Sequence, residues 1–138
     1  MSVEGANWIV DNDREPGRGW SAYVVFELPS PPSSNNLFGN RKDGQGRYRT
    51  RAYEDWIVHA GYALNRARVP TINGPVKITM SFPEPKGRAD LDGKPKAVDD
   101  LLVRHGILPD DSNKYIRELR LKWCEPGDQC RIEIEAAA

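Results

Sequence analysis

Apolar residues along the chain recur with two periods, one of two residues and one close to three and a half. Residues 22–28 are mostly β-branched or aromatic and stop at Pro29, which predicts a strand. Every second residue of 76–82 is apolar, which predicts a half-buried strand. Residues 115–123 and 130–134 alternate in the same way on either side of a Pro-Gly turn. The pattern therefore predicts four strands.

Two segments have the spacing of amphipathic helices. The first begins after Thr50, a residue type that caps helices, and ends before Pro70. The second begins near Pro95, which suits a first helical turn, and ends at Gly106. The order β-α-β-α-β-β predicts an α+β (mixed α/β) fold, a small mixed sheet with two main helices packed on it. The predicted inward-facing residues are Tyr53, Trp56, Ile57, Ala60, Leu64 and Ala67 in the first helix, and Val98, Leu101, Leu102 and His105 in the second.

The remaining segments lack a sustained period. Residues 1–20 are polar, with Gly and Pro, and are interpreted as a flexible N-terminal arm; residues 21–138 then form a single domain. Residues 29–36 are rich in Pro, Ser and Asn, which disfavour regular structure. The loop continues through Gly39, Gly44 and Gly46. A long loop in a compact domain is usually functional or disordered.

Composition excludes some classes of protein. No apolar run approaches the roughly 20 residues that span a bilayer, and residues 1–20 lack the features of a secretory signal. We therefore expect a cytoplasmic protein with no membrane partner. Cys124 and Cys130 flank a turn and could meet across a hairpin, but so sparse a pair is more typical of two reduced thiols. The two histidines and two cysteines do not have zinc-site spacing.

Charge is distributed unevenly although the formal net charge is zero. Residues 41–51 carry five basic residues against one acid, Asp43, whereas acids predominate in residues 90–111. A chain with this pattern can hold an anionic polymer with one region and metal ions with another.

The acidic region begins with Asp90-Leu91-Asp92. In an extended segment, residues two apart point to the same face, so both carboxylates would point into one volume. A cation is then needed to neutralise them, and Mg²⁺ is usually held by a few carboxylates, water and phosphate oxygens. Lys86 and Arg88 precede the pair. The alternative is a turn whose acidic residues are only solvated.

Residues 88–101 (RADLDGKPKAVDDL) and 106–111 (GILPDD) resemble the RusA family of Holliday junction resolvases, small phage- and prophage-associated endonucleases. The family pattern is an acidic D-L-D, a lysine four residues after its second Asp, a helix ending in D-x-L, and a turn closing on D-D. The segment PSPPSSNN at 29–36 is similar to the family's proline-rich P-P-S-N-N segment. The resemblance extends over roughly residues 22–135, as judged from these motifs.

This resemblance implies a role for each matching residue. Asp90, Asp92 and Asp111 match the metal-binding aspartates, with Asp110 beside them as a further ligand, and Lys96 matches the active-site lysine. Asp100 matches the helix aspartate. The implied cofactor is Mg²⁺, with Mn²⁺ as the alternative. The implied substrate is a four-way junction or other branched DNA, cut in recombination or repair by a homodimer in a bacterial or phage-infected cell.

Two departures from the family pattern stand out. Ala89 directly precedes Asp90, where the family has a denser arginine run, and residues 1–20 are an addition. We expect DNA contacts from the basic loop, with Phe38 or Tyr48 stacking on an unpaired base; the alternative is a solvated loop. The predicted DNA-binding residues are Arg41, Lys42, Arg47, Arg49, Arg51, Lys86, Arg88 and Lys94.

The residues also suit phosphodiester hydrolysis chemically. Mg²⁺ held by the aspartates would polarise the phosphate and lower the pKa of a bound water. Lys96 would neutralise the developing charge; the alternative is a surface lysine paired with Asp92 or Asp100. Two other functions compete with the endonuclease: a non-catalytic protein of the same fold that binds branched DNA, and a small regulatory domain that binds divalent ions.

Overall fold

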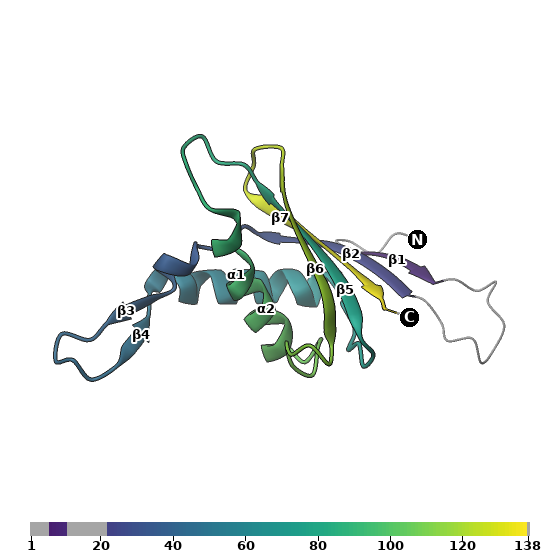
Figure 1. The fold of residues 1–138 in the computed structure, drawn as a ribbon, viewed down its shortest axis with the longest axis horizontal. Helices are drawn as coiled ribbons and strands as arrows, with labels where there is room; N and C mark the ends of the chain where they lie inside the picture. The colour runs from purple at the N-terminus through teal and green to yellow at the C-terminus, as the bar shows by residue number, and fades with distance from the viewer. Residues whose placement is uncertain (1–5, 11–21, 138) are drawn as a thin grey trace.

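The computed structural model describes residues 6–10 and 22–137, and these form an α+β fold. Five strands form one mixed sheet in the order β1-β2-β7-β5-β6, and two more form a separate hairpin, β3-β4. Figure 1 shows the two helices packed against the sheet and the hairpin extending away from it. The elements are β1 (Ala6–Val10), β2 (Ala22–Pro29), η1 (Ser34–Asn36), β3 (Phe38–Asn40), β4 (Arg47–Arg49), α1 (Arg51–Ala67), β5 (Val76–Pro83), η2 (Leu91–Gly93), α2 (Pro95–Arg104), β6 (Ile116–Cys124) and β7 (Gln129–Ala136).

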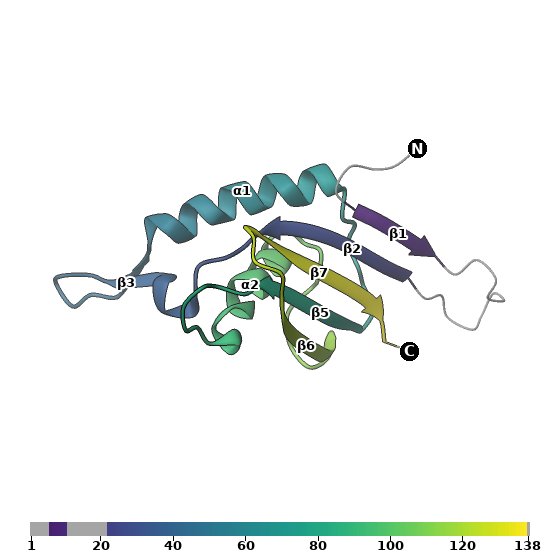
Figure 2. The same ribbon diagram turned by 90° about the horizontal axis from the view of Figure 1, so that it is seen from above.

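The predicted order β-α-β-α-β-β is confirmed for the elements that form the core. β7 lies between β2 and β5 and pairs antiparallel with both, while β5 pairs in parallel with β6. The parallel pair needs a crossover connection, which η2 and α2 provide. Figure 2 shows the strands from above, with β6 at one edge of the sheet.

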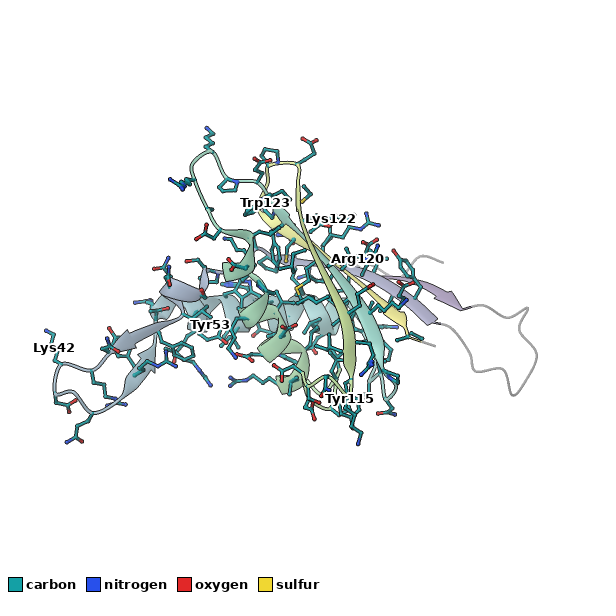
Figure 3. All side chains as sticks on the ribbon, viewed as in Figure 1. Lys42, Tyr53, Tyr115, Arg120, Lys122 and Trp123 are labelled. Atoms are coloured by element: carbon teal, nitrogen blue, oxygen red, sulfur yellow. The ribbon has the colours of Figure 1, made fainter. Side chains whose placement is uncertain are left out.

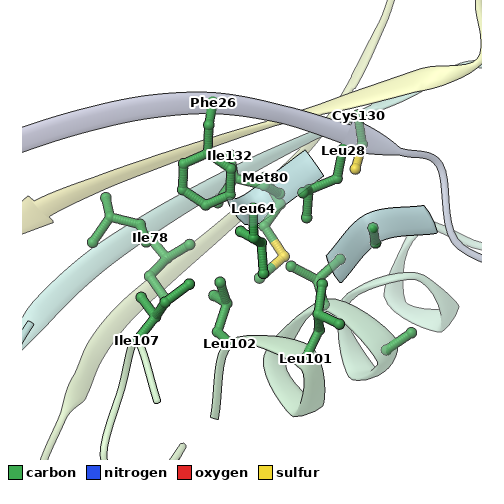
Figure 4. Packing of buried hydrophobic residues seen from close by; sticks show 14 of the residues in the cluster. Phe26, Leu28, Leu64, Ile78, Met80, Leu101, Leu102, Ile107, Cys130 and Ile132 are labelled. Atoms are coloured by element: carbon green, nitrogen blue, oxygen red, sulfur yellow. The ribbon is translucent and has the colours of Figure 1, made fainter. Parts of the chain in front are cut away.

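Alternation in the strands places most of the large apolar side chains on one face of the sheet. Val76, Ile78, Met80 and Phe82 are each 0% exposed, and Ile132 in β7 is buried among them (Figure 4). Full burial of one such side chain stabilises the fold by roughly 1.5–3 kcal/mol. The other face carries charged and polar residues, among them Lys77, Glu133 and Glu135. The sheet therefore has one face for the core and one for solvent.

Helix α1 begins and docks as its sequence predicts. The Thr50 side chain accepts a hydrogen bond from the Tyr53 backbone N–H at 3.2 Å, which satisfies one free donor of the first turn. The indole of Trp56 donates to the Pro29 carbonyl at 2.7 Å and ties the helix to the end of β2. All six predicted inward residues are buried except Ile57, which is half-buried.

Three predictions about local structure were wrong. Residues 6–10, inside the expected flexible arm, form β1, because the free edge of β2 is available to Asn7-Trp8-Ile9-Val10 for antiparallel pairing; the rest of the arm lies outside the described residues. The expected loop at 38–49 is a hairpin, since Gly44 and Gly46 adopt the positive φ values that a tight turn needs. His105 is exposed because the helix ends at Arg104.

The position of His105 has a packing reason. After Arg104 the chain leaves helical geometry and turns at Gly106, whose φ is +70°. The imidazole then lies against Gly61 of α1, where an added Cβ would come within 3.0 Å of His105 Nε2. A side chain at Gly61 would therefore require the exposed imidazole of His105 to shift slightly.

No helix in the described ranges is long and apolar enough to cross a membrane. Both cysteines are free thiols, so the expectation of two reduced thiols agrees with the structure. Cys130 is fully buried, and burial raises the pKa of its thiol to about 12.

Candidate active site

Acidic side chains lie on three consecutive segments around α2. Asp90 and Asp92 precede the helix, Asp99 and Asp100 are in it, and Asp111 lies in the turn that follows. The turn leads directly into β6, so the fold returns the chain to the side of α2 after the helix ends. Residues far apart along the segment can therefore share one region of the surface.

Asp99 is the most unusual of these carboxyl groups. Its Oδ1 is inaccessible to solvent and has no hydrogen-bond partner among the described residues. Its pKa is raised to about 7, mainly by burial and then by the Asp111 and Asp100 carboxylates, while Lys96 acts in the opposite direction. An unpaired buried oxygen beside two other carboxylates is costly unless a proton or a cation is present. Asp99 and Asp111 therefore lie within electrostatic reach of one another.

Sequence reasoning did not select Asp99 as a site residue. The signal that could have found it is its position, seven residues after Asp92 and three after Lys96, which places all three on one helical stripe. The resemblance instead points to the neighbouring Asp100, which matches the helix aspartate of the family pattern.

Lys96 makes an ion pair with Asp100 on the next turn of α2. Its Nζ lies 3.5 Å from Asp100 Oδ1, and the two side chains are 60% and 37% exposed. Of the two partners considered for the lysine, the structure selects Asp100. A pair this exposed contributes about 0.3–0.5 kcal/mol to stability, so Lys96 can leave it at little cost.

Asp110 has a different environment from Asp111. Its carboxylate accepts a hydrogen bond from the Ser112 backbone N–H at 2.6 Å, and interaction with the Ser112 side chain, followed by this backbone bond, lowers its pKa. The interaction closes the turn that follows α2. Asp110 therefore orients the turn, while Asp111 lies close enough to Asp99 to affect its titration.

The Asp90–Asp92 segment is not extended as predicted. Asp90 is extended, but Leu91–Gly93 forms a 3₁₀ turn. With three residues per turn, Asp90 and Asp92 do not project to one side in the way that strand residues do. Both are exposed. The approach of Pro95 and the start of α2 explain why the chain coils at this point.

No three acidic, histidine or cysteine side chains within residues 6–10 and 22–137 are arranged to hold a metal ion. The donor chemistry nevertheless suits a hard cation, since all the groups are carboxylates, and the unpaired Asp99 oxygen lacks a positive partner. The structure thus brings Asp99 and Asp111 together and leaves Asp90 and Asp92 exposed on the adjoining segment.

The basic residues separate into three groups. Arg41 and Lys42 lie at the end of the hairpin, and Figure 3 shows Lys42 at its far tip. Lys86 and Arg88 are exposed in the connection between β5 and η2. Lys94 instead reaches the Pro31 carbonyl at 3.5 Å, so it links the start of α2 to the proline-rich segment.

Other predicted DNA-binding residues have partners within the chain. The Arg47 guanidinium lies 4.5 Å above the centre of the Phe38 ring. The guanidinium of Arg51 lies 3.9 Å from Asp55 in a highly exposed pair, with the arginine side chain 94% exposed. Arg49 faces a cavity described next.

Of the two aromatic residues considered for stacking on a base, Tyr48 is the more available. Phe38 is half-buried and packs edge-to-face on Tyr53, with ring centres 5.6 Å apart. Tyr48 is 50% exposed. Its ring lies across Gly39, where an added Cβ would come within 2.5 Å, so only glycine permits this arrangement.

A groove with a volume of about 350 Å³ lies between the hairpin, α1 and α2. One wall carries Phe38, Arg49, Tyr53 and Ile57, and the other is formed by the side of α2 that bears Asp100, Val103 and Arg104, with Asp111 beside it. Figure 3 shows Tyr53 between the hairpin and α2. The groove therefore adjoins the acidic region.

No family model matches the chain, and no curated protein matches its sequence. The resemblance to the RusA family therefore rests on the motifs in residues 29–36, 88–101 and 106–111.

Proposed function

We propose that the protein is a divalent-metal-dependent endonuclease of the RusA type, which cuts four-way junctions or other branched DNA by paired phosphodiester hydrolysis. One observation carries the proposal: the Asp100 and Asp111 carboxylates both lie within electrostatic reach of the partly buried Asp99, and Lys96, which pairs with Asp100, acts on it with the opposite sign. A folded protein rarely keeps like charges together and partly buried without a function, because the arrangement costs stability.

The acidic region would hold the cofactor. Asp111 and Asp99 supply oxygen ligands from two elements, and Asp90 and Asp92 supply more from the exposed segment before α2. Mg²⁺, or Mn²⁺ in its place, would polarise the scissile phosphate and lower the pKa of a bound water. Closing the site would require the segment around Asp90 to approach α2.

Lys96 would act on the phosphate. Its ammonium group is exposed and its ion pair with Asp100 is weak, so it is free to turn towards an incoming phosphodiester. A positive charge placed where negative charge develops stabilises the transition state more than the ground state. We therefore assign Lys96 to the chemical step and not mainly to substrate affinity.

The hairpin and the β5–η2 connection would hold the DNA arms. Arg41, Lys42, Lys86 and Arg88 are exposed, and they lie on two separate segments that both extend from the body of the protein in Figure 1. Contacts from two projecting segments suit a branched substrate better than a single flat basic surface does. Each phosphate contact adds affinity through release of counterions.

A homodimer is part of this proposal because resolving a junction takes two cuts on opposing strands. Strand β6 is the candidate interface: it lies at the edge of the sheet, and Leu119 on it is 38% exposed. Antiparallel pairing of two β6 edges could place Glu118 opposite Arg120 or Lys122 of the second copy, which matches charge in a two-fold arrangement. Sedimentation at micromolar concentration tests the dimer.

The second candidate function is a non-catalytic protein that binds branched DNA. It is favoured by the absence, in the described ranges, of three converging metal ligands. Cleavage and binding assays separate the two functions.

The deciding experiment incubates the protein with a labelled synthetic four-way junction and, as the matched control, a linear duplex of the same sequence. Reactions contain Mg²⁺, Mn²⁺ or EDTA. The endonuclease predicts paired nicks in the junction with either metal and none with EDTA or with the linear duplex. Junction binding without cleavage under all conditions would select the non-catalytic alternative.

A further inference from the structure

We propose that the groove between the hairpin, α1 and α2 is a binding site for one nucleotide of a DNA strand. Its phosphate would lie between Arg49 and Arg104, and its sugar and base would lie against Ile57 and Val103. This inference rests on the proposed endonuclease, since it places the nucleotide next to the bond that is cut.

Charge is the first argument. Arg49 comes from the hairpin side of the groove and Arg104 from α2, so one guanidinium is supplied by each wall. Neither has an ion-pair partner within 4.0 Å among the described residues, although Asp100 and Asp111 line the same groove. Two unpaired guanidinium groups facing one cavity match a phosphate, which arginine binds through paired hydrogen bonds.

The state of Tyr53 supports this arrangement. Burial raises the pKa of its hydroxyl group, the Asp100 carboxylate raises it further, and the positive charges of Arg49, Lys96 and Arg104 act to lower it. These four charged groups, which come from β4 and α2, therefore all lie within electrostatic reach of one hydroxyl group on α1. Tyr53 itself is 4% exposed and is fixed by packing on Phe38 and Trp56, so the floor of the groove is rigid.

Size and lining are the second argument. The volume of about 350 Å³ lies at the lower end of the range for small-molecule sites, which is roughly 300–1,000 Å³. Ile57 and Val103 are half-buried, so they offer apolar surface on either side of the groove. A phosphate with a sugar and base attached matches two guanidinium groups beside apolar walls, whereas an inorganic anion would leave the walls uncovered.

Continuity with the acidic region is the third argument. Asp111, one of the proposed metal ligands, lines the groove, and so does Asp100, which pairs with Lys96. A strand that enters the groove at Arg49 would therefore pass the acidic side chains and Lys96 as it leaves. The carboxylates repel phosphate in the absence of metal, so the nucleotide's phosphate takes the place between the two arginines.

The test uses the full chain and thymidine 3′,5′-bisphosphate as the probe, in EDTA so that no metal takes part. Binding is followed by amide chemical shifts in ¹H–¹⁵N spectra. The inference predicts shifts concentrated at Tyr53, Ile57, Val103 and Arg104, and weaker binding of inorganic phosphate. Arg49→Gln and Arg104→Gln should each weaken probe binding roughly tenfold to a hundredfold, the range for loss of a hydrogen bond to a charged group.

Arg66→Gln is the matched control, because it removes an exposed arginine from the last turn of α1, outside the groove. Ile57→Trp should fill the groove and abolish probe binding; unchanged melting temperatures establish that each variant is folded. Shifts that map elsewhere, or equal affinity for inorganic phosphate, would overturn the inference. Junction cleavage without probe binding contradicts this inference alone, whereas probe binding without cleavage contradicts the endonuclease.

Discussion

The centre of the sheet and helix α2 differ in the kind of side chain that they bury. In the sheet, β5 and β7 bury apolar side chains almost completely, and no buried polar side-chain atom of these strands lacks a hydrogen-bond partner. On α2, Asp99 holds an inaccessible oxygen with no partner, close to two further carboxylates. The sheet core therefore stabilises the fold, whereas the unpaired buried carboxyl group of Asp99 destabilises it. Such a local loss of stability is typical of a site that binds a charged ligand.

The largest expected effect is the loss of cleavage on Asp111→Asn. The substitution removes a proposed metal ligand together with a negative charge that would face phosphate. Cleavage of a four-way junction in Mg²⁺ should fall below detection, while junction binding in a mobility-shift assay stays equal or becomes tighter. The control is Asp128→Asn, an exposed aspartate in the β6–β7 turn, which should cut normally. Cleavage by Asp111→Asn at the wild-type rate would remove Asp111 from the site.

The sheet supplies the contrasting prediction. Ile132→Ala deletes buried methyl and methylene groups at a position with 0% exposure, and should lower the free energy of unfolding by about 2–5 kcal/mol. Urea unfolding measures this loss. At temperatures where the variant stays folded, its cleavage rate should be unchanged, because the side chain lies away from the acidic region. If Ile132→Ala unfolded with the wild-type free energy but cleaved slowly, the sheet would serve the reaction and not stability, which contradicts this prediction.

Lys96→Ala should slow cleavage by roughly 10²–10³-fold, the usual cost of losing a group that stabilises transition-state charge. Its effect on unfolding should be a few tenths of a kcal/mol, since the ion pair with Asp100 is exposed. Single-turnover rates at saturating enzyme separate the chemical step from binding. Equal losses in rate and in affinity would make Lys96 a residue that positions the DNA.

Asp99→Asn should stabilise the protein in a pH-dependent way. The pKa of Asp99 is raised from 3.8 to about 7, so between these values the folded protein keeps a proton that the unfolded chain releases. Wild-type stability therefore falls as pH rises from about 4 to about 7. In EDTA the variant should match the wild type near pH 4 and exceed it at pH 8, by at most about 4 kcal/mol. A difference that does not change with pH would show that Asp99 is not buried as a proton-binding group.

The same contrast explains what the sequence predicted well. The strands at 76–82 and 130–134 and the helix after Thr50 were recognisable because burial imposes a period on side chains that must avoid water. The start of the first helix was also predictable from its cap, since the Thr50 side chain accepts a hydrogen bond from the Tyr53 backbone N–H. These elements depend on local pattern and on one shared core.

The site was harder to predict because it depends on contacts between segments. The carboxylates that raise the pKa of Asp99 come from α2 and from the turn after it. No local sequence pattern indicates that this turn brings Asp111 close to the helix. The expected extended geometry of Asp90–Asp92 was wrong because the following helix start imposed a 3₁₀ turn. Likewise, pairing of β1 with β2 depends on a free sheet edge that residues 1–20 alone do not reveal.

The central claim is that the carboxylates around α2 form one divalent-cation site, and paramagnetic broadening by Mn²⁺ tests it most directly. The ¹H–¹⁵N spectrum of the full chain is recorded during titration with Mn²⁺, alongside Asp111→Asn. The account predicts that signals from 90–92, 96–100 and 110–112 broaden first, and that the variant needs much more Mn²⁺ for the same effect. Broadening centred on Glu133 and Glu135 on the outer face of the sheet, or the same titration curve in Asp111→Asn, would contradict it.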